Sequence, residues 1–291
     1  FGQVSQEVRL AGVAGSLDWL VGAFYAKENL DSRSILKYGQ DFYPYFDTRV
    51  LGGVPGLLGL SSAAIHQAGN GSDDRYAQED TTFALFTDNT WSVTDALKLT
   101  VGLRYTNSDK SLTTLYGTTG ASCDQGEGAY ATLVGLAGVA TARSIVGGLC
   151  LNAQNNDFDA LGRFEQSSKE EETTGTAKLT YKFSDDIMGY VSYARGYKSG
   201  GFNLDRSSRG RITPLGSPLP YNTAVNCAVA SGCLDFQVLS DTSFAPEFVD
   251  SYEIGFKTKW LNNSLLFNAT MFHQTYTDFQ LNTFVGTAFI V

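Results

Sequence analysis

Residues 97–106, LKLTVGLRYT, carry the clearest pattern of apolar and polar positions in the chain. Every second position in this stretch holds an apolar side chain: Leu97, Leu99, Val101, Leu103 and Tyr105. A helix would scatter these side chains around its axis, because successive helical residues are turned by about 100°. In a β-strand they share one face, and about ten residues suffice for a tilted strand to cross a bilayer. The pattern predicts a strand whose one face meets an apolar environment.

The same period of two recurs along the chain and predicts about eight antiparallel strands in four hairpins. The predicted pairs are 3–13 with 17–30, 79–91 with 97–107, 173–183 with 187–197, and 247–260 with 264–278. Short polar turns close each pair. Long connections rich in Gly, Ser, Asn and Asp join one hairpin to the next, at about 31–78, 108–172 and 198–246. Strict alternation of tight turns and long loops favours an all-β fold, a transmembrane β-barrel fragment with short periplasmic turns and long extracellular loops.

The three tryptophans of the chain, Trp19, Trp91 and Trp260, all lie beside the predicted short turns. In a soluble β-sandwich, tryptophan belongs in the middle of a strand, inside the core. At a membrane–water interface its ring faces the lipid tails while its N–H reaches water. The placement therefore predicts a membrane-interface girdle at the periplasmic rim. Five tyrosines lie towards the opposite strand ends, as a second girdle would: Tyr25, Tyr105, Tyr193, Tyr197 and Tyr276.

Amino-acid composition argues against several other kinds of partner and site. Glycine and aromatic residues are abundant, and the formal net charge of −9 argues against a nucleic-acid partner, which would require a basic face. No apolar run is long enough for a membrane helix. The four cysteines, Cys123, Cys150, Cys227 and Cys233, form no CxxC pair and have only two histidines beside them. They favour two disulfides over a zinc site; three pairings are possible, and nearest neighbours are the simplest.

No catalytic or cofactor motif emerges from the sequence. His66 and His273 have no recognisable nucleophile or metal-ligand partners, and GxSxG, GxGxxG and GxxxxGK[ST] motifs are absent. The glycine-rich KSGG at 198–201 follows a strand with no helix after it, which argues against a phosphate loop. The sequence thus predicts no enzyme, no metal and no cofactor.

Two regions offer candidate ligand contacts. The segment 40–49, QDFYPYFDTR, clusters aromatic side chains in the first long loop, and these suit either ligand capture by stacking or packing of the loop on its neighbours. The candidates there are Tyr43, Tyr45 and Phe46. Arg195 and Lys198 lie near the predicted outer rim, where either ligand contact or strand-end hydrogen bonding explains them.

Other loop features have plainer explanations. The charged run 169–172, KEEE, is expected to be a solvated loop face, with attraction of a cationic or polar ligand as the alternative. The apolar pieces 51–69 and 129–149 predict short helices packed within the loops. Contact with a partner lipoprotein is the alternative for these pieces.

Several stretches resemble the barrel of TonB-dependent outer-membrane receptors. They are SQEVRLAG, WLVGAFYAKE, FTDNTWSVTDALKLTVGLRYTNSDK, YKFSDDIMGYVSYARGYKSGGFN and FAPEFVDSYEIGFKTKWLNNSLLFNATMFHQTYTDFQ, with ARGYKSGGFN and PEFVDSYEIGFKTKW the most specific. The resemblance covers all four hairpins and not the long loops. It implies a 22-stranded barrel with a plugged lumen, of which residues 1–291 form part of one barrel domain without the plug.

The resemblance implies an outer-membrane active-transport receptor of a Gram-negative bacterium. Such a receptor takes up a scarce nutrient (siderophore-bound iron, cobalamin or a saccharide) with energy that TonB supplies through the plug. The partners expected are outer-membrane lipid, the small-molecule nutrient and TonB. The alternatives are a small eight-stranded outer-membrane porin or adhesin, a secreted saccharide-binding β-sandwich, and an outer-membrane hydrolase, which lacks a Ser–His pair here.

Overall fold

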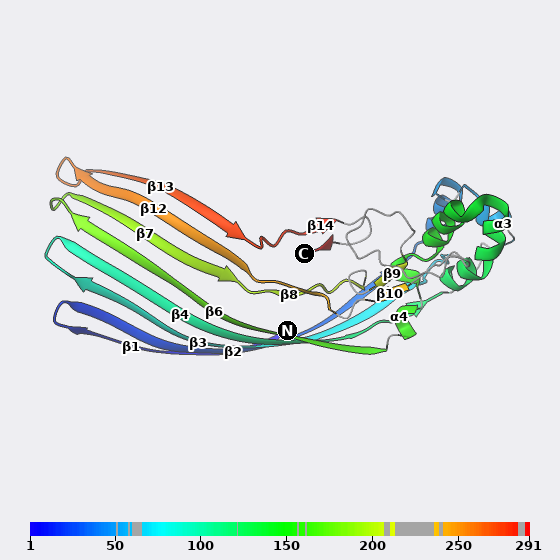
Figure 1. Cartoon of the computed structure of the whole chain (residues 1–291), viewed down its shortest axis with the longest axis horizontal. Coiled ribbons are helices and arrows are strands. Elements are labelled where there is room, and N and C mark those ends of the chain that lie inside the picture. The colour runs from blue at the N-terminus through cyan, green and yellow to red at the C-terminus, as the bar shows by residue number, and fades with distance from the viewer. Residues whose placement is uncertain are drawn as a thin grey trace.

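A computed structural model gives the fold of the chain. It describes residues 1–50, 52–57, 59, 66–120, 122–155, 157–160, 162–206, 210–212, 236–238, 241–284 and 289–291. Most of these residues belong to one large antiparallel sheet, with helical loop segments gathered at one of its ends (Figure 1).

Eight long strands build this sheet in the order β1-β2-β3-β4-β6-β7-β12-β13, and the short β5 pairs with β3. The long strands are β1 (Gly2–Ala14), β2 (Leu17–Lys37), β3 (Gly71–Ser92), β4 (Leu97–Leu115), β6 (Arg163–Lys182), β7 (Ile187–Lys198), β12 (Glu247–Trp260) and β13 (Leu265–Thr277). Neighbours in the sheet are also neighbours along the chain, so the four predicted hairpins are confirmed. Their tight turns lie together at the end opposite the helices (Figure 1).

The strands beside the first two long loops are longer than the sequence pattern predicts. β2 continues to Lys37, β3 begins at Gly71, β4 continues to Leu115 and β6 begins at Arg163. These extensions are mostly polar, yet they pair without interruption from Asn29 with Glu79 to Lys37 with Gly71. The run 169–172 therefore lies within β6, and its prediction as loop is wrong. Backbone pairing holds the extensions in place where no apolar alternation marks them.

Turn chemistry explains two of the hairpin ends. Gly15 has φ of +62°, a left-handed conformation that glycine adopts without steric cost, and only Gly15 and Ser16 separate β1 from β2. At the fourth hairpin, Leu261, Asn262 and Asn263 all have positive φ, between 53° and 66°. Asparagine tolerates this region better than other residues with a side chain, so two of these three positions fit the turn.

The register assigns every residue of the sheet to one of two faces. We call the face with Leu97, Leu99, Val101, Leu103 and Tyr105 the outer face and the opposite one the inner face. Directly paired residues share a face, so the pairing of β3 with β4 and of β4 with β6 extends the outer face across the sheet. Apolar side chains on it are exposed in this chain: Val8, Leu10, Val21, Leu85, Leu103, Leu179, Val191, Ile254 and Met271.

The register also resolves the segment 83–86, which is apolar on both faces. Leu85 pairs with Tyr105 on the outer face, and Phe83 lies on the same face. Phe86 pairs with Arg104 and lies on the inner face. Its ring has the guanidinium of Arg104 at 5.7 Å, so an aromatic residue among inner-face charges contributes a cation–π contact.

Short elements fill the connections between hairpins. The helical ones are α1 (Phe42–Tyr45), the π-helical turn η1 (Phe46–Val50), α2 (Val54–Leu57), α3 (Ser122–Leu149), the 3-10 turn η2 (Asn152–Gln154) and α4 (Asp157–Ala160). The short strands are β5 (Thr118–Thr119), β8 (Gly201–Phe202), β9 (Gly210–Ile212), β10 (Phe236–Val238), β11 (Ser243–Phe244), β14 (Thr283–Phe284) and β15 (Phe289–Ile290). α3 bends at Gly138, where φ is +78°.

Hydrophobic cores lie in the loops and at the loop end of the sheet. One cluster contains Cys123, Leu133, Ala142, Ile145, Val146, Leu149 and Cys150, all from α3 or adjoining it. The second joins β3, β4 and the following segments through Tyr76, Leu112, Tyr116, Phe158 and Phe202. We call the segments around both clusters the outer loop assembly. In the part of the chain that the structure describes, no helix is long and apolar enough to cross a membrane.

Candidate ligand-binding site

The first long loop packs its aromatic residues against α3. Tyr43 and Phe46 contact the cluster of buried α3 residues, whereas Tyr45 stays exposed. Phe42 stacks on Phe46 with ring centroids 5.2 Å apart. The arrangement gives Tyr43 and Phe46 the packing role that the sequence left open beside ligand capture. Of the three candidates, only Tyr45 presents a largely exposed ring.

A disulfide closes the second long loop. Cys123 and Cys150 are bonded with an S–S distance of 2.10 Å, which joins the start of α3 to the residue after its end. This is the nearest-neighbour pairing. Both cysteines are buried in the α3 cluster, so the bond ties the ends of a bent helix into one compact unit. Cys227 and Cys233 lie outside the described residues, and their pairing stays a prediction.

His66 connects the first loop to the second. Its side chain is fully buried, with Nδ1 against the Gln154 amide oxygen and Nε2 at 3.2 Å from the Gly148 carbonyl oxygen. The rings of Phe42 and Phe46 cross it edge-on at 5.3 and 5.2 Å. Burial lowers the pKa of His66 below its usual 6.5, and the two hydrogen bonds oppose that shift. His66 is thus a structural connection between two loops.

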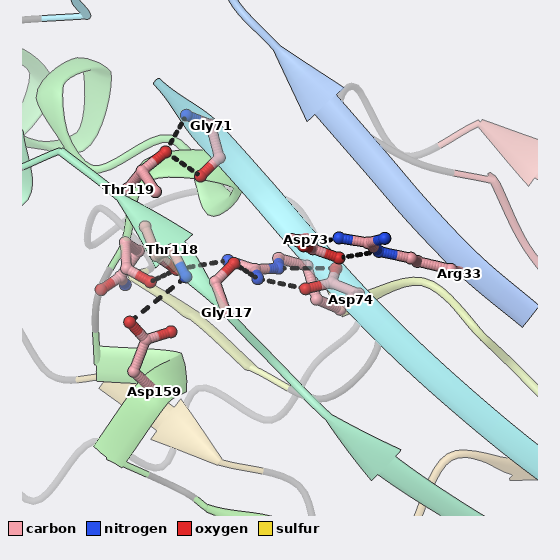
Figure 2. Close-up of polar contacts among 10 residues, drawn as sticks. Arg33, Gly71, Asp73, Asp74, Gly117, Thr118, Thr119 and Asp159 are labelled. Atoms are coloured by element: carbon pink, nitrogen blue, oxygen red, sulfur yellow. Dashed lines mark hydrogen bonds and ion pairs between the residues drawn. The ribbon is translucent and has the colours of Figure 1, made fainter. Parts of the chain in front are cut away.

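Arg206, which the sequence did not single out, connects all three long loops. It is buried and forms a two-point ion pair with Asp74 of β3, with Nε donating to Oδ2 at 2.9 Å. Its other N–H groups donate to Thr118 Oγ1 and the Gly117 carbonyl, each at 2.9 Å. Figure 2 shows Asp74, Gly117 and Thr118 around this contact. Residues 132 positions apart are thereby fixed together.

Aromatic rings lie over this contact, and a second ion pair lies beside it along β3. The Arg206 guanidinium lies 4.8 Å over Phe158 and 5.5 Å over Tyr116. Next along β3, Asp73 accepts a 2.6 Å hydrogen bond from Arg33 Nε of β2 (Figure 2). That pair is largely exposed and contributes little to stability, whereas the buried pair is costly to break.

The KSGG stretch after β7 is held by a buried lysine and a buried glutamate. Lys110 Nζ donates to the Gly200 carbonyl at 2.5 Å and to Ser199 Oγ. Glu170 accepts from Ser199 Oγ at 2.7 Å and from Gly200 N at 2.9 Å. A Cβ on Gly200 would lie 2.3 Å from the Phe244 carbonyl, so only glycine fits there. These contacts give the stretch a structural role, and Glu170 is buried within β6.

Inner-face side chains line a hollow of about 380 Å³ between β1, β3, β4 and β6. The Arg104 guanidinium lies 5.7 Å from the Phe86 ring and 5.4 Å from the Phe24 ring, and the Arg9 guanidinium lies 5.7 Å from the Phe86 ring. Arg195 of β7 pairs with Gly175, so its side chain lies on the outer face, where Nη1 is 3.4 Å from Asp250. The polar side chains that line the hollow are Glu7, Arg9, Asp88, Arg104, Thr174 and Thr176. Such a wall suits a polar or charged occupant.

The sequence-derived candidates do not form one cluster. The side chain of Arg195 lies on the outer face of β7, whereas Lys198 is the last residue of β7, exposed and paired in register with Glu247. Tyr43 and Phe46 belong to the outer loop assembly. Arg104 was missed as a ligand candidate because, in sequence, it is one polar position in a regular alternation. Among the described residues, no group of three His, Cys, Asp or Glu side chains is placed to hold a metal ion.

The tryptophans lie at the short-turn ends of β2, β3 and β12. Trp91 and Trp260 are about half exposed. Trp91 Nε1 donates to Ser16 Oγ in the first turn at 3.0 Å, and Trp260 Nε1 donates to Thr258 Oγ1 at 2.8 Å. Trp19 lies across Gly12 of β1, where a Cβ would be 2.8 Å from the ring.

The sheet, its apolar outer face and its polar inner face define the wall of an outer-membrane β-barrel. The β-barrel model of the TonB dependent receptor-like family matches residues 5–290, and the chain belongs to this family. Its members are transport receptors of the Gram-negative outer membrane. The predicted fold class and location are therefore confirmed, and the soluble β-sandwich alternative is wrong.

Three solved receptors are similar to the chain. The ferric yersiniabactin uptake receptor FyuA of Yersinia pestis has 18% identity and a TM-score of 0.52, with 96% of this chain and 29% of that chain covered. The siderophore receptor PiuA of Acinetobacter baumannii has 16% identity and a TM-score of 0.49, with 93% and 31% covered. The ferric-catecholate import receptor Fiu of Escherichia coli K12 has 12% and 0.46, with 99% and 32% covered. The chain spans less than a third of each receptor. No curated protein matches its sequence.

Proposed function

We propose that the protein carrying this chain is an active-transport receptor for a scarce nutrient. The nutrient is a small molecule, such as a ferric siderophore, cobalamin or a saccharide, and TonB supplies the energy through a plug domain. The family match over residues 5–290 is the observation that carries the proposal. The chain is similar in fold to the ferric yersiniabactin uptake receptor, so siderophore-bound iron is the ligand to test first.

The arrangement of the described residues suggests how the work is divided. The outer loop assembly is rigidified by a disulfide and a buried ion pair, and it presents Tyr45 at its surface. Below it, the inner-face hollow offers Arg104 to anionic or polar groups of a ligand. On this view, the loop surface captures the nutrient, and the inner wall contacts it on the way through the barrel. The proposal assigns no catalytic step to the chain.

We further propose that Trp19, Trp91 and Trp260 form the periplasmic rim of the membrane-spanning wall, as the sequence predicts. Their position beside the short turns supports this role, since an amphipathic ring is most stable at the lipid–water boundary.

Equilibrium binding to the full-length receptor tests the ligand class. Purified receptor is titrated with a ferric siderophore panel, cobalamin and oligosaccharides, and uptake of any ligand that binds is measured in cells with and without TonB. We expect Arg104→Ala to weaken binding of an anionic ligand roughly tenfold. Arg163→Ala is the matched control, because Arg163 is exposed and outside the hollow. Uptake that persists without TonB contradicts active transport and favours the porin alternative.

A further inference from the structure

The outer face of the sheet contains an apolar groove that the transport function does not use. It lies across β6, β7, β12 and β13 and has a volume of about 640 Å³. Gly189 forms part of its floor, and because Gly189 has no side chain, the Phe183 ring lies directly over it, 3.0 Å from where a Cβ would be. Tyr181 and Phe183 border the groove on one side, with their ring centroids 4.9 Å apart. Phe256 borders the other side and packs on Phe267 at 5.8 Å.

The groove offers very little polar surface to an occupant. Its outer-face walls are made by aliphatic and aromatic side chains, among them Leu179, Ile254 and Met271. Tyr190, which also borders it, turns its hydroxyl to the inner face, where it contacts Glu253 and lies 3.1 Å from Thr270 Oγ1. A peptide or polar ligand would lose hydrogen bonds to water here without replacement. A hydrocarbon chain would lose none.

The extent of the groove matches one leaflet of the bilayer. Its members lie near the periplasmic turns, the farthest of them, Met271, six residues from Leu265 at the start of β13. At roughly 3.3 Å per residue this is about 20 Å along the strand, or about 14 Å in depth for a strand tilted by about 45°. Half of the ~30 Å hydrocarbon core is ~15 Å. The groove is also continuous with the lipid-facing surface of an outer-membrane barrel.

We propose that this groove holds one acyl chain of a phospholipid from the periplasmic leaflet of the outer membrane. Exposed side chains elsewhere on the outer face meet lipid that exchanges freely. In the groove, a chain is flanked by Tyr181 and Phe183 on one side and by Phe256 on the other, over a floor that includes Gly189, so it exchanges more slowly and stays with the protein.

Native mass spectrometry of the full-length receptor, released from bilayers of phosphatidylethanolamine and phosphatidylglycerol, tests the proposal. Gly189→Leu places a side chain in the floor; the nearest atom to its Cβ is 3.0 Å away on the flexible Phe183 ring, which can move. Ala23→Leu is the matched control, because Ala23 is a small outer-face residue paired with Leu85 and outside the groove. We expect one retained phospholipid on the wild type and on Ala23→Leu, and its loss from Gly189→Leu.

Equal lipid retention by all three proteins, including retention by none, overturns the proposal. A receptor dimer that the Gly189→Leu change dissociates would also overturn it, since a second copy would then occupy the groove. If Gly189→Leu does not fold, as judged by heat-dependent gel mobility, Ala269→Leu fills the same groove from β13 and replaces it.

Discussion

The sheet and the outer loop assembly are stabilised in different ways. The sheet is held by long, uninterrupted backbone pairing, and its outer face exposes large apolar side chains such as Leu103 and Met271. The outer loop assembly has its own buried clusters, a disulfide and a buried ion pair. The first region depends on lipid to cover its apolar face, whereas the second is built like a small soluble domain. Substitutions should therefore act on each region by a different mechanism.

The largest effect is expected for Arg206→Ala. It leaves the Asp74 carboxylate buried without its partner, and breaking a buried pair from one side costs about 3–5 kcal/mol. Hydrogen exchange should show lost protection around Thr118, while the strands near the short turns remain protected. Arg163→Ala, at an exposed pair, should change little. Unchanged protection in Arg206→Ala would contradict the role given to this pair.

In the sheet, Leu103→Arg should be the costly change. A cation on the lipid-facing side of a membrane strand costs about 2–4 kcal/mol near the bilayer midplane. Thr176→Arg, on the inner face in the row of Gly102 and Asp88, is the matched control and should cost much less. Unfolding of the full-length receptor from lipid bilayers in guanidinium measures both. Equal costs would mean that the two faces have been assigned wrongly.

Removal of the Cys123–Cys150 disulfide should destabilise the loops alone. Because the bond closes a segment of 27 residues, its loss by double substitution to serine should cost about 2–4 kcal/mol locally. Limited proteolysis should then cut within α3, whereas heat-dependent gel mobility of the barrel stays unchanged. A variant that fails to form the barrel would show that the two regions are not independent.

The smallest expected effect is a pH dependence of the stability of the outer loop assembly. Because the pKa of His66 is lowered in the folded state, the unfolded loop binds a proton more readily. The outer loop assembly should therefore lose stability as pH falls below about 6.5, and keep it above that value. Hydrogen exchange of residues 42–46 across this range is the measurement. His66→Gln should remove the dependence, whereas His273→Gln, at an exposed strand position, should leave it intact.

The sequence predicts the sheet well because its signals are local. Period-two alternation and turn residues sit within a few positions of each other, as in β4 and the turn before it. The strand extensions escape prediction because pairing with neighbouring strands and contacts with distant segments hold their polar residues, and no local alternation marks them. Phe86 shows the same limit on a smaller scale. The run 83–86 is apolar at every position, so the sequence does not say which face Phe86 takes, and only its register with Arg104 places it on the inner face.

The candidate site was less predictable. The Arg206–Asp74 pair spans 132 positions, and no local pattern joins its members. Glu170 sits in a charged run typical of solvated surface, yet one residue in the run turns inward to Gly200. Tyr43 and Phe46 have a composition that suits ligand stacking, but α3 supplies their partners from a different loop. Such contacts depend on how loops meet, which the strand pattern does not specify.

The most direct test of the central claim is a nitroxide scan of β4 from residue 99 to 104 in the full-length receptor in bilayers. Each position is replaced by cysteine, spin-labelled and probed with oxygen, which concentrates in lipid, and with a water-soluble nickel chelate. The account predicts a strict period of two, with oxygen favoured at Leu99, Val101 and Leu103 and the alternate positions shielded from oxygen. Uniform accessibility to the nickel chelate along the strand would contradict a lipid-facing outer surface.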